Sequence, residues 1–481
     1  MQDVSEVPVK KAAARDAMET LLEFGLTLKY EDLPPAVAAR TKLAVLDTLG
    51  AAIAGIRGES VAELSSLACC FGGSPQATLI TNGRKLPLPL AALVNATAAR
   101  AWDLDDVHEQ NTCHVSASLV PAALALCEAR GPIPGSELIT AIAVAAELIC
   151  RMSAAPRISP AETGSSLSYQ CAFYAVALMA SRLMKLSDRQ SHDALGIAHA
   201  RAAGNQQGLL QGAMTVRLMQ GVAAEGGIMS ALMAERNISG SRAILEGRFG
   251  YYPVFQRGQY EPNDLTGQLR ERWLCNDVSV KPLYPCCKFI HGPIDALLSA
   301  MRTSGIGASG IEGVHVTLTN PDIYDLICGS RERKWNPATI TDAQFSLPYI
   351  LAWAAIHDGV DFSALSSRGL SDPGVKAMMS RIDVTVATGL QAQGRAKFPM
   401  PGMVAVAEKS GRITQEAFEY VKGHPHNPMS FDEVAEKFRA CARFGRPDWN
   451  NVEQVVEFVA ALEASEDAGK LAGHCAHSSA A

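Results

Sequence analysis

The sequence predicts a mainly α-helical protein in which one large helical domain is interrupted by a smaller α+β domain. Three observations lead to this fold class. The chain has 481 residues, which is more than a single hydrophobic core usually serves, and 48% of them are hydrophobic. Apolar residues recur at three- and four-residue steps in the first half and again near the end, as on one face of a helix. Between residues 276 and 414, alternating and β-branched segments appear instead.

The first half is expected to be a series of helices. Within residues 41–55, one helical face collects Leu43, Leu46, Leu49 and Ile53. Pro89 suits the first turn of a helix that runs toward an acidic cluster and ends near Asp105. Further helical patterns cover 114–131, 135–152, 170–187 and 216–237. Frequent Ala, Gly and Ser on these faces would let the helices approach closely.

After about residue 275 the pattern changes. Segments 313–319, 381–387 and 403–413 are expected to be strands, and the last contains Lys-Ser-Gly-Arg, a good hairpin turn. Helices are expected between them at 291–301 and 342–359.

Helical pattern resumes near the C-terminus, where a capping box, Ser430 to Glu433, opens a helix. We therefore expect a discontinuous helical domain, a lid domain inserted into it, and loose tails. The expected bounds are 10–275 with 415–465 for the helical domain, 276–414 for the lid, and 1–9 with 466–481 for the tails.

Charge and cysteine content narrow the function classes. The net charge of −6 and a pI near 6.0 argue against a nucleic-acid partner, although a small anionic substrate needs only local positive charge. Twelve cysteines are scattered without zinc spacing, which favours reduced thiols in a cytoplasmic protein. The N-terminus lacks a signal-peptide core, and apolar runs are broken before 18 residues, so no membrane span is expected.

The stretch WDLDDVHEQNTCH, residues 102–114, concentrates titratable groups at an expected helix end. The macrodipole of a helix disfavours negative charge at its C-terminal end. The presence of Asp103, Asp105 and Asp106 at that end therefore suggests a function for them. Together with His114 they suit proton transfer near neutral pH. A metal site made of Asp and His is a second interpretation. A third is a solvated acidic loop in which His114 only caps the next helix.

Residues 281–298, KPLYPCCKFIHGPIDALL, form a second dense stretch. A thiol of Cys286 or Cys287 beside Lys288 and His291 could have a lowered pKa and act as a base or nucleophile. The alternative is a buried cysteine that behaves as a small hydrophobe. Zinc is not expected, because adjacent cysteines seldom share one tetrahedral ion.

Two isolated residues complete the candidates. Arg217 lies in an otherwise apolar helix, where it either extends to solvent or offers two parallel donors to a carboxylate. Tyr349 follows Pro348 and is either a packed aromatic or an acid.

Taken together, these motifs resemble the MmgE/PrpD family, which includes 2-methylcitrate dehydratase, cis-aconitate decarboxylase and iminodisuccinate epimerase. The resemblance covers nearly the whole chain. Its motifs are VLDTLGAAIAG, DLDD eleven residues ahead of HVSASLVPAAL, RLMQGVAAEGG, KPLYPCCKFIHGPIDA, DAQFSLPYILA and GHPHNPMSFDEVAEKFR. It implies a helical domain made from both ends of the chain, a smaller α+β lid, and usually a homodimer.

Carried over by position, Asp103 and His114 match the family's acid–base pair. Lys281 matches the start of the lid segment, and Tyr349 matches the tyrosine of a Ser-Leu-Pro-Tyr motif. Three positions depart from the decarboxylase-type members. Ser166 and Cys287 stand where those members carry histidines, and Val216-Arg217 stands where they carry a lysine motif.

The chemistry that this resemblance implies is proton removal next to a carboxylate, followed by loss of water, loss of carbon dioxide or reprotonation. We expect a cofactor-independent hydro-lyase that acts on a small di- or tricarboxylate, without a metal. An epimerase, a decarboxylase and a catalytically silent homologue are the alternatives. Donors aimed at the developing oxyanion or the substrate carboxylates would come from Arg217, Lys281, Lys288, Ser166 and Tyr349. Catalysis would fall to Asp103, His114, Tyr349 and Cys287, while Asp105 and Asp106 would orient or cap.

Overall fold

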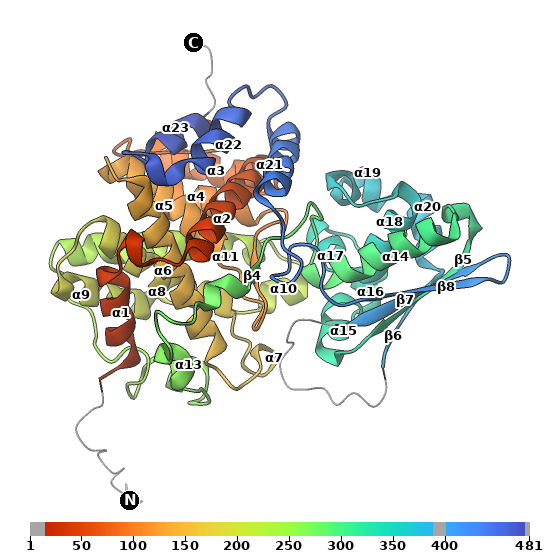
Figure 1. Cartoon of the computed structure of the whole chain (residues 1–481), viewed down its shortest axis with the longest axis horizontal. Coiled ribbons are helices and arrows are strands. Elements are labelled where there is room, and N and C mark those ends of the chain that lie inside the picture. The colour runs from red at the N-terminus through yellow and green to blue at the C-terminus, as the bar shows by residue number, and fades with distance from the viewer. Residues whose placement is uncertain (1–14, 388–400, 477–481) are drawn as a thin grey trace, which may run out of the picture.

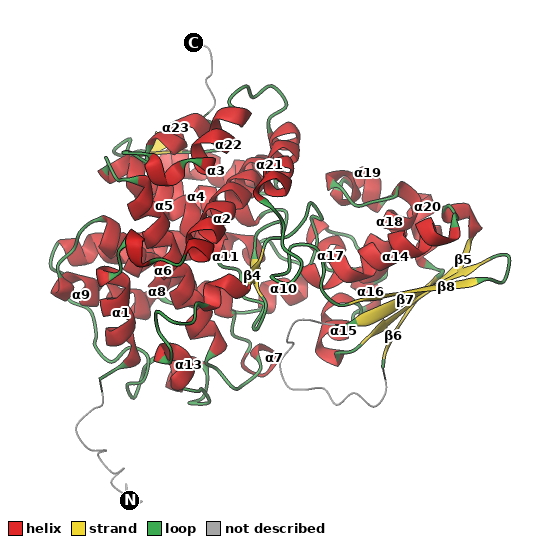
Figure 2. Cartoon of the chain, viewed as in Figure 1, coloured by secondary structure: helices red, strands yellow, loops and turns green. Residues whose placement is uncertain are grey.

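A computed structural model of the chain describes residues 15–387 and 401–476. Helices dominate it, and the longest strands gather at one end of the molecule (Figures 1 and 2). We call the helices within residues 17–266 and 431–475 the helical body, and the helices and strands within residues 291–418 the α+β part. The fold class predicted from the sequence is confirmed.

The helical body begins with thirteen elements of very different length. Its N-terminal helices are α1 (Ala17–Thr27), α2 (Pro35–Ala54), α3 (Val61–Phe71), α4 (Leu88–Arg100), α5 (Ser116–Arg130), α6 (Gly135–Ala154), α7 (Pro160–Thr163), α8 (Leu167–Leu183), α9 (Asp188–Arg201), α10 (Gln207–Gln211), α11 (Thr215–Glu235), α12 (Tyr251–Phe255) and α13 (Asn263–Thr266). Two short antiparallel pairs, which the sequence pattern did not predict, are β1 (Ala77–Thr78) with β2 (Lys85–Leu86) and β3 (Val107–His108) with β4 (Val278–Ser279).

The α+β part is built on one four-stranded sheet of order β6-β5-β7-β8. Its strands are β5 (Ile311–Leu318), β6 (Ile382–Val386), β7 (Gly402–Glu408) and β8 (Ile413–Phe418). Strand β5 is parallel to β6 and antiparallel to β7, and β7 and β8 form the expected hairpin. The helices of this part are α14 (His291–Ser304), α15 (Pro321–Ile327), α16 (Arg331–Lys334), α17 (Ile340–Gln344), α18 (Leu347–His357), α19 (Ser367–Leu370) and α20 (Pro373–Met379). Helix α14 packs on β7 and β8, and α18 packs on α14 (Figure 1).

The C-terminal helices return to the helical body. They are α21 (Phe431–Gly445), α22 (Val452–Ala460) and α23 (Lys470–Cys475). Helix α21 packs on α2, although the two lie almost 400 residues apart in the sequence (Figure 1). The buried ammonium of Lys437 on α21 lies 2.6 Å from Asp47 of α2 and donates to the carbonyls of Leu104 and Lys281. Lys437 thereby links the N-terminal helix α2 and the C-terminal helix α21 to Leu104 and Lys281, which lie in the two stretches singled out in the sequence.

The two parts also share an aromatic contact. The ring of Trp102, just after α4, lies 5.5 Å from the rings of both Phe362 and Phe444 in edge-on geometry, and these two phenyl rings stack on each other at 3.8 Å. Such contacts add stability beyond the area that they bury. They hold the acidic stretch against the α+β part.

Several local expectations need correction. Helix α4 ends at Arg100, before the acidic cluster rather than within it. Residues 342–359 are not one helix, because Ser346 caps a new helix, α18, after α17 has ended. The tail expected from residue 466 is in its described part the packed helix α23, with Leu471 and Cys475 buried. The tail expected at residues 1–9 lies outside the described residues, and the bounds of a separate lid domain stay a prediction.

Within residues 15–387 and 401–476, no helix has both the length and the hydropathy that crossing a membrane requires. The cytoplasmic location and the homodimer that we expected from the sequence stay predictions.

Candidate active site

A cavity of about 170 Å³ lies where the helical body meets the α+β part. Its wall includes Arg100, Asp103 and His114 from the acidic stretch and Ser166, Ser168 and Tyr169 at the start of α8. The opposite wall is formed by Lys281, Cys287, Lys288 and Phe289, between β4 and α14, and by Leu326 and Phe345 of the α+β part. The two stretches singled out in the sequence therefore face the same space.

The backbone of residues 102–114 folds back on itself and brings His114 close to the aspartates at the start of this stretch. Asp103 has a φ of 56°, the left-handed region that residues with a side chain rarely adopt and that often marks functional sites. Strand β3 follows, and Val107 bridges to His114, which returns the chain to the start of the stretch. The carboxylate of Asp106 accepts from the backbone N–H of Ser116 at 2.8 Å and so caps α5.

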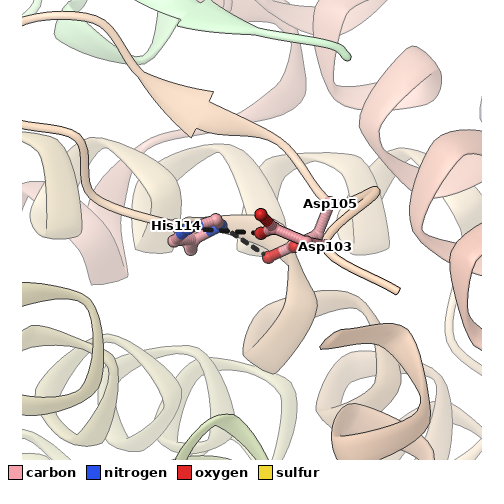
Figure 3. A group of neighbouring side chains, drawn as sticks. All are labelled: Asp103, Asp105 and His114. Carbon is pink, nitrogen blue, oxygen red and sulfur yellow. Dashed lines mark hydrogen bonds and ion pairs between the residues drawn. The ribbon is translucent and has the colours of Figure 1, made fainter. Parts of the chain in front are cut away.

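His114 is held by a carboxylate on one side and a guanidinium on the other. Its Nδ1 lies 2.8 Å from Asp105 Oδ2 (Figure 3). Its Nε2 lies 3.2 Å from Nη2 of Arg100. A guanidinium can only donate, so Nε2 must accept, and the ring proton must lie on Nδ1 and point to Asp105. This arrangement fixes a neutral imidazole in one tautomer, with its lone pair on Nε2.

The electrostatics of the site favour the same protonation state. Burial and the nearby Arg100 charge lower the pKa of His114. Burial alone would raise the pKa of Asp105, but the Arg100 charge and the hydrogen bond from His114 outweigh it and hold that pKa well below its usual range. A neutral imidazole beside an ionised carboxylate is a base ready to accept a proton.

The contacts of Asp103 differ from the pairing with His114 that the sequence suggested. Its Oδ1 lies 4.0 Å from His114 Nε2, so the hydrogen-bonded partner of His114 is Asp105 (Figure 3). The Asp103 carboxylate pairs instead with Arg100 and, at 3.0 Å, with Lys281. Burial opposes its ionisation, yet these two cations lower its pKa. An ionised aspartate with two cation partners is a poor base, and we assign it to positioning Arg100 and Lys281.

The donor atoms of Asp103, Asp105 and His114 lie within 4.8 Å of one another, close enough to share a metal ion. Both carboxylates, however, already bind the guanidinium of Arg100, and Asp103 also binds the Lys281 ammonium. A divalent cation would have to enter beside two fixed positive charges. The donor set therefore fits an ion-pair network better than a metal centre.

Cys287 lines the cavity, but its surroundings do not favour a thiolate. Burial, followed by the Asp103 charge, raises the pKa of Cys287 to about 12. The thiol therefore stays protonated near neutral pH, against the sequence-based expectation of a proton-transfer or nucleophilic role.

Replacing Cys287 with alanine is expected to change kcat less than threefold, since no deprotonated sulfur is available to lose. Steady-state kinetics of Cys287→Ala against wild type, with thiol-alkylation rates in parallel, would check this. Loss of activity by two orders of magnitude would restore the thiol as a catalytic group.

Lys288 and Ser166 also line the cavity, as a binding role requires. The Lys288 ammonium pairs with Glu109 and lies 2.7 Å from the hydroxyl of Ser279. Burial, only partly offset by Glu109, lowers the pKa of Lys288 to about 8. Ser166 is the half-buried residue that precedes α8.

The structure does not bring Arg217 and Tyr349 into the cavity wall. The guanidinium of Arg217 is buried and donates to Gln344 Oε1 at 2.6 Å, and its neighbour Val216 lines the cavity instead. The Tyr349 hydroxyl donates to the carbonyl of Ala364 at 2.5 Å, beside a separate cavity of about 300 Å³. Their positions support a packing role for both residues.

Arg100 and Tyr169 are site residues that sequence reasoning missed. Arg100 precedes Asp103 by three residues, a spacing that could have signalled an ion pair at the helix end. Tyr169 donates its hydroxyl to the carbonyl of Val216, and burial raises its pKa to about 12. No feature of the sequence around Tyr169 indicates that it lies at a cavity.

Comparison with known proteins gives a consistent relationship along the chain. The model of the MmgE/PrpD N-terminal domain matches residues 19–263, and that of the MmgE/PrpD C-terminal domain matches residues 284–460. Cis-aconitate decarboxylase of Aspergillus terreus is 27% identical, over 94% of each chain. The human protein of the same name is 24% identical, over 92% of this chain and 91% of the human one. That of Mus musculus is 24% identical, over 92% of this chain and 90% of the mouse one. The chain therefore belongs to the MmgE/PrpD family.

Proposed function

We propose that this protein is a lyase that needs no cofactor and acts on a small di- or tricarboxylate, with His114 as the group that moves the proton. The observation that carries the proposal is the Asp105–His114–Arg100 arrangement at the wall of a cavity. Relatives that are named as decarboxylases, which are lyases, support the same class of enzyme.

The first step uses the groups that surround His114. A substrate carboxylate that binds Nη2 of Arg100 takes the place of Nε2 as acceptor, and brings its neighbouring carbon next to the freed lone pair. Nε2 then accepts the proton of that carbon, and Asp105 stabilises the imidazolium. The negative charge that develops on the carboxylate is met by the cations of Arg100, Lys281 and Lys288.

Loss of water fits this resting state best. In a dehydration, the electron pair of the broken C–H bond forms the double bond, and a hydroxyl on the next carbon leaves with one proton as water. That sequence begins with proton removal, for which a neutral His114 is prepared.

Loss of carbon dioxide is the second candidate, because the curated relatives carry that activity in their names. In a decarboxylation, the pair of the broken C–C bond stays on carbon, which then takes one proton. It therefore needs a protonated His114 at the start. Epimerisation has less support, because burial raises the pKa of Cys287 and so disfavours the thiolate that a two-base exchange needs in one of its two directions.

A pH–rate profile separates the two lyase reactions. We expect the purified protein to dehydrate citrate or 2-methylcitrate, with kcat/KM constant at neutral pH and falling only at acid pH, because the lowered pKa of His114 delays protonation of the imidazole. Proton NMR identifies the products, and trapped carbon dioxide with cis-aconitate as substrate measures the alternative.

A decarboxylase would show the opposite slope, with kcat/KM rising toward acid pH. Complete inactivity on all three acids, together with no thermal shift from any of them, would contradict the proposed function.

A further inference from the structure

The cavity that holds His114 adjoins a second cavity of about 260 Å³. The two share wall residues from both parts of the molecule, among them Thr112, Leu167 and Leu326. The second cavity therefore lies next to the space at His114, between the helical body and α15.

The second cavity differs from the first in its chemistry. Apolar side chains dominate its wall: Leu167 of α8, Leu210 of α10, Phe289, and Ile323 and Leu326 of α15. Leu210 is 65% exposed, so its side chain is available to contact a molecule in this cavity. Covering this wall with an alkyl chain would remove apolar surface from water.

Charge changes sign between the two cavities. The inner wall carries three cations, Arg100, Lys281 and Lys288, against the one carboxylate of Asp103, so its net charge is positive and favours carboxylates. Among the described residues that line the outer cavity, the charged ones are Asp322 and Asp325, both exposed. A carboxylate in the outer cavity would be repelled by them, so the carboxylates of a ligand belong inside and its uncharged portion outside.

We propose that the substrate is a polycarboxylate with a linear alkyl substituent, whose carboxylates lie at Arg100 and Lys281 and whose alkyl chain lies along Leu210, Ile323 and Leu326. This inference rests on the proposed function for the location of the carboxylates. It adds the class of substrate, an amphiphilic acid rather than a fully polar one.

A chain-length series tests the proposal. Citrates with a methyl, propyl or pentyl group on one methylene carbon are supplied to the wild-type protein, and KM is measured for each that turns over. We expect KM to fall about fourfold for each methylene that becomes buried. For acids that do not turn over, the dissociation constant from calorimetry replaces KM and should follow the same trend.

A matched pair of leucine substitutions locates the alkyl chain. Leu210→Asp places a charge in the outer wall and is expected to raise KM for the pentyl compound at least tenfold more than for the methyl compound. Leu67→Asp changes a leucine of α3 that is 56% exposed and lies outside both cavities, and it should leave the series unaltered.

The outcomes separate this inference from the proposed function. A methyl compound that turns over as well as the pentyl one, in wild type and in Leu210→Asp alike, overturns the alkyl site while leaving the lyase intact. Tighter binding of longer chains without any turnover upholds the alkyl site and counts against the lyase.

Discussion

His114→Gln is expected to lower kcat by about 10²- to 10⁴-fold, the usual contribution of a positioned acid–base group. The glutamine amide can still donate to Asp105, so the ionised carboxylate keeps a partner and the fold is retained. The amide cannot accept a proton at carbon, so the loss should fall on kcat rather than KM. Steady-state kinetics with the best substrate of the series, with circular dichroism to verify folding, measure this.

The chain offers a close control for this substitution. On the exposed face of the sheet, Nδ1 of His315 lies 3.0 Å from the carboxylate of Asp383, a pair similar to His114 with Asp105 but without a cavity. His315→Gln should leave kcat within twofold of wild type. An equal loss in both variants would show that the effect is structural, and retention of kcat in His114→Gln would remove His114 from the mechanism.

Arg100→Met is expected to abolish detectable turnover and to lower the free energy of unfolding by about 3–5 kcal/mol at pH 7. The guanidinium is buried and binds both Asp103 and Asp105, so its removal leaves two buried carboxylates without their shared cation. The substrate carboxylate would lose its anchor at the same time.

The pH dependence of that destabilisation gives a second readout. In the wild type, the lowered pKa values of Asp103 and Asp105 contribute stability at neutral pH that is lost as pH falls through the acid range. Without Arg100 these carboxylates favour the protonated form, so the variant should lose less stability on acidification. Urea unfolding at pH 7 and pH 5 would therefore show a difference between the two proteins that narrows at pH 5.

Arg439→Met is the control for a surface arginine. Its guanidinium pairs with Glu453 and Glu436 on the exposed side of α21, where an ion pair contributes less than about 1 kcal/mol. A similar, small effect of Arg100→Met would mean that the buried network does not hold the site together.

Much of the fold could be predicted from the sequence, because its elements carry local signals. The strands β5 and β6 and the β7–β8 hairpin follow from β-branched alternation and a turn at Ser410-Gly411. The capping box at Ser430 places the start of α21. The short pairs β1–β2 and β3–β4 have two residues a strand, too few for an alternating pattern to be recognised.

The same reasoning predicted the two stretches that form the site, but not all of the contacts within it. The acidic stretch and the Lys281–Lys288 segment were identified because dense titratable residues are unusual in a chain with 19% charged residues. The sequence assigned Asp105 and Asp106 together to orienting or capping, and which of the two would contact His114 depended on the left-handed turn at Asp103, which has no sequence signature. The expectation that Arg217 binds a substrate carboxylate failed for a related reason. Its partner Gln344 lies 127 residues further along the chain, and a contact between such distant residues cannot be predicted from the local sequence.

The central claim is that Nε2 of His114, a neutral imidazole nitrogen at the seam of the two parts, takes a proton from carbon beside a carboxylate. Deuterium exchange measures this most directly. Wild-type protein in deuterated water should introduce deuterium at that carbon of recovered substrate or product, detected by NMR, and His114→Gln should not. Equal deuterium incorporation by the two proteins, or none by an active wild type, would contradict the claim.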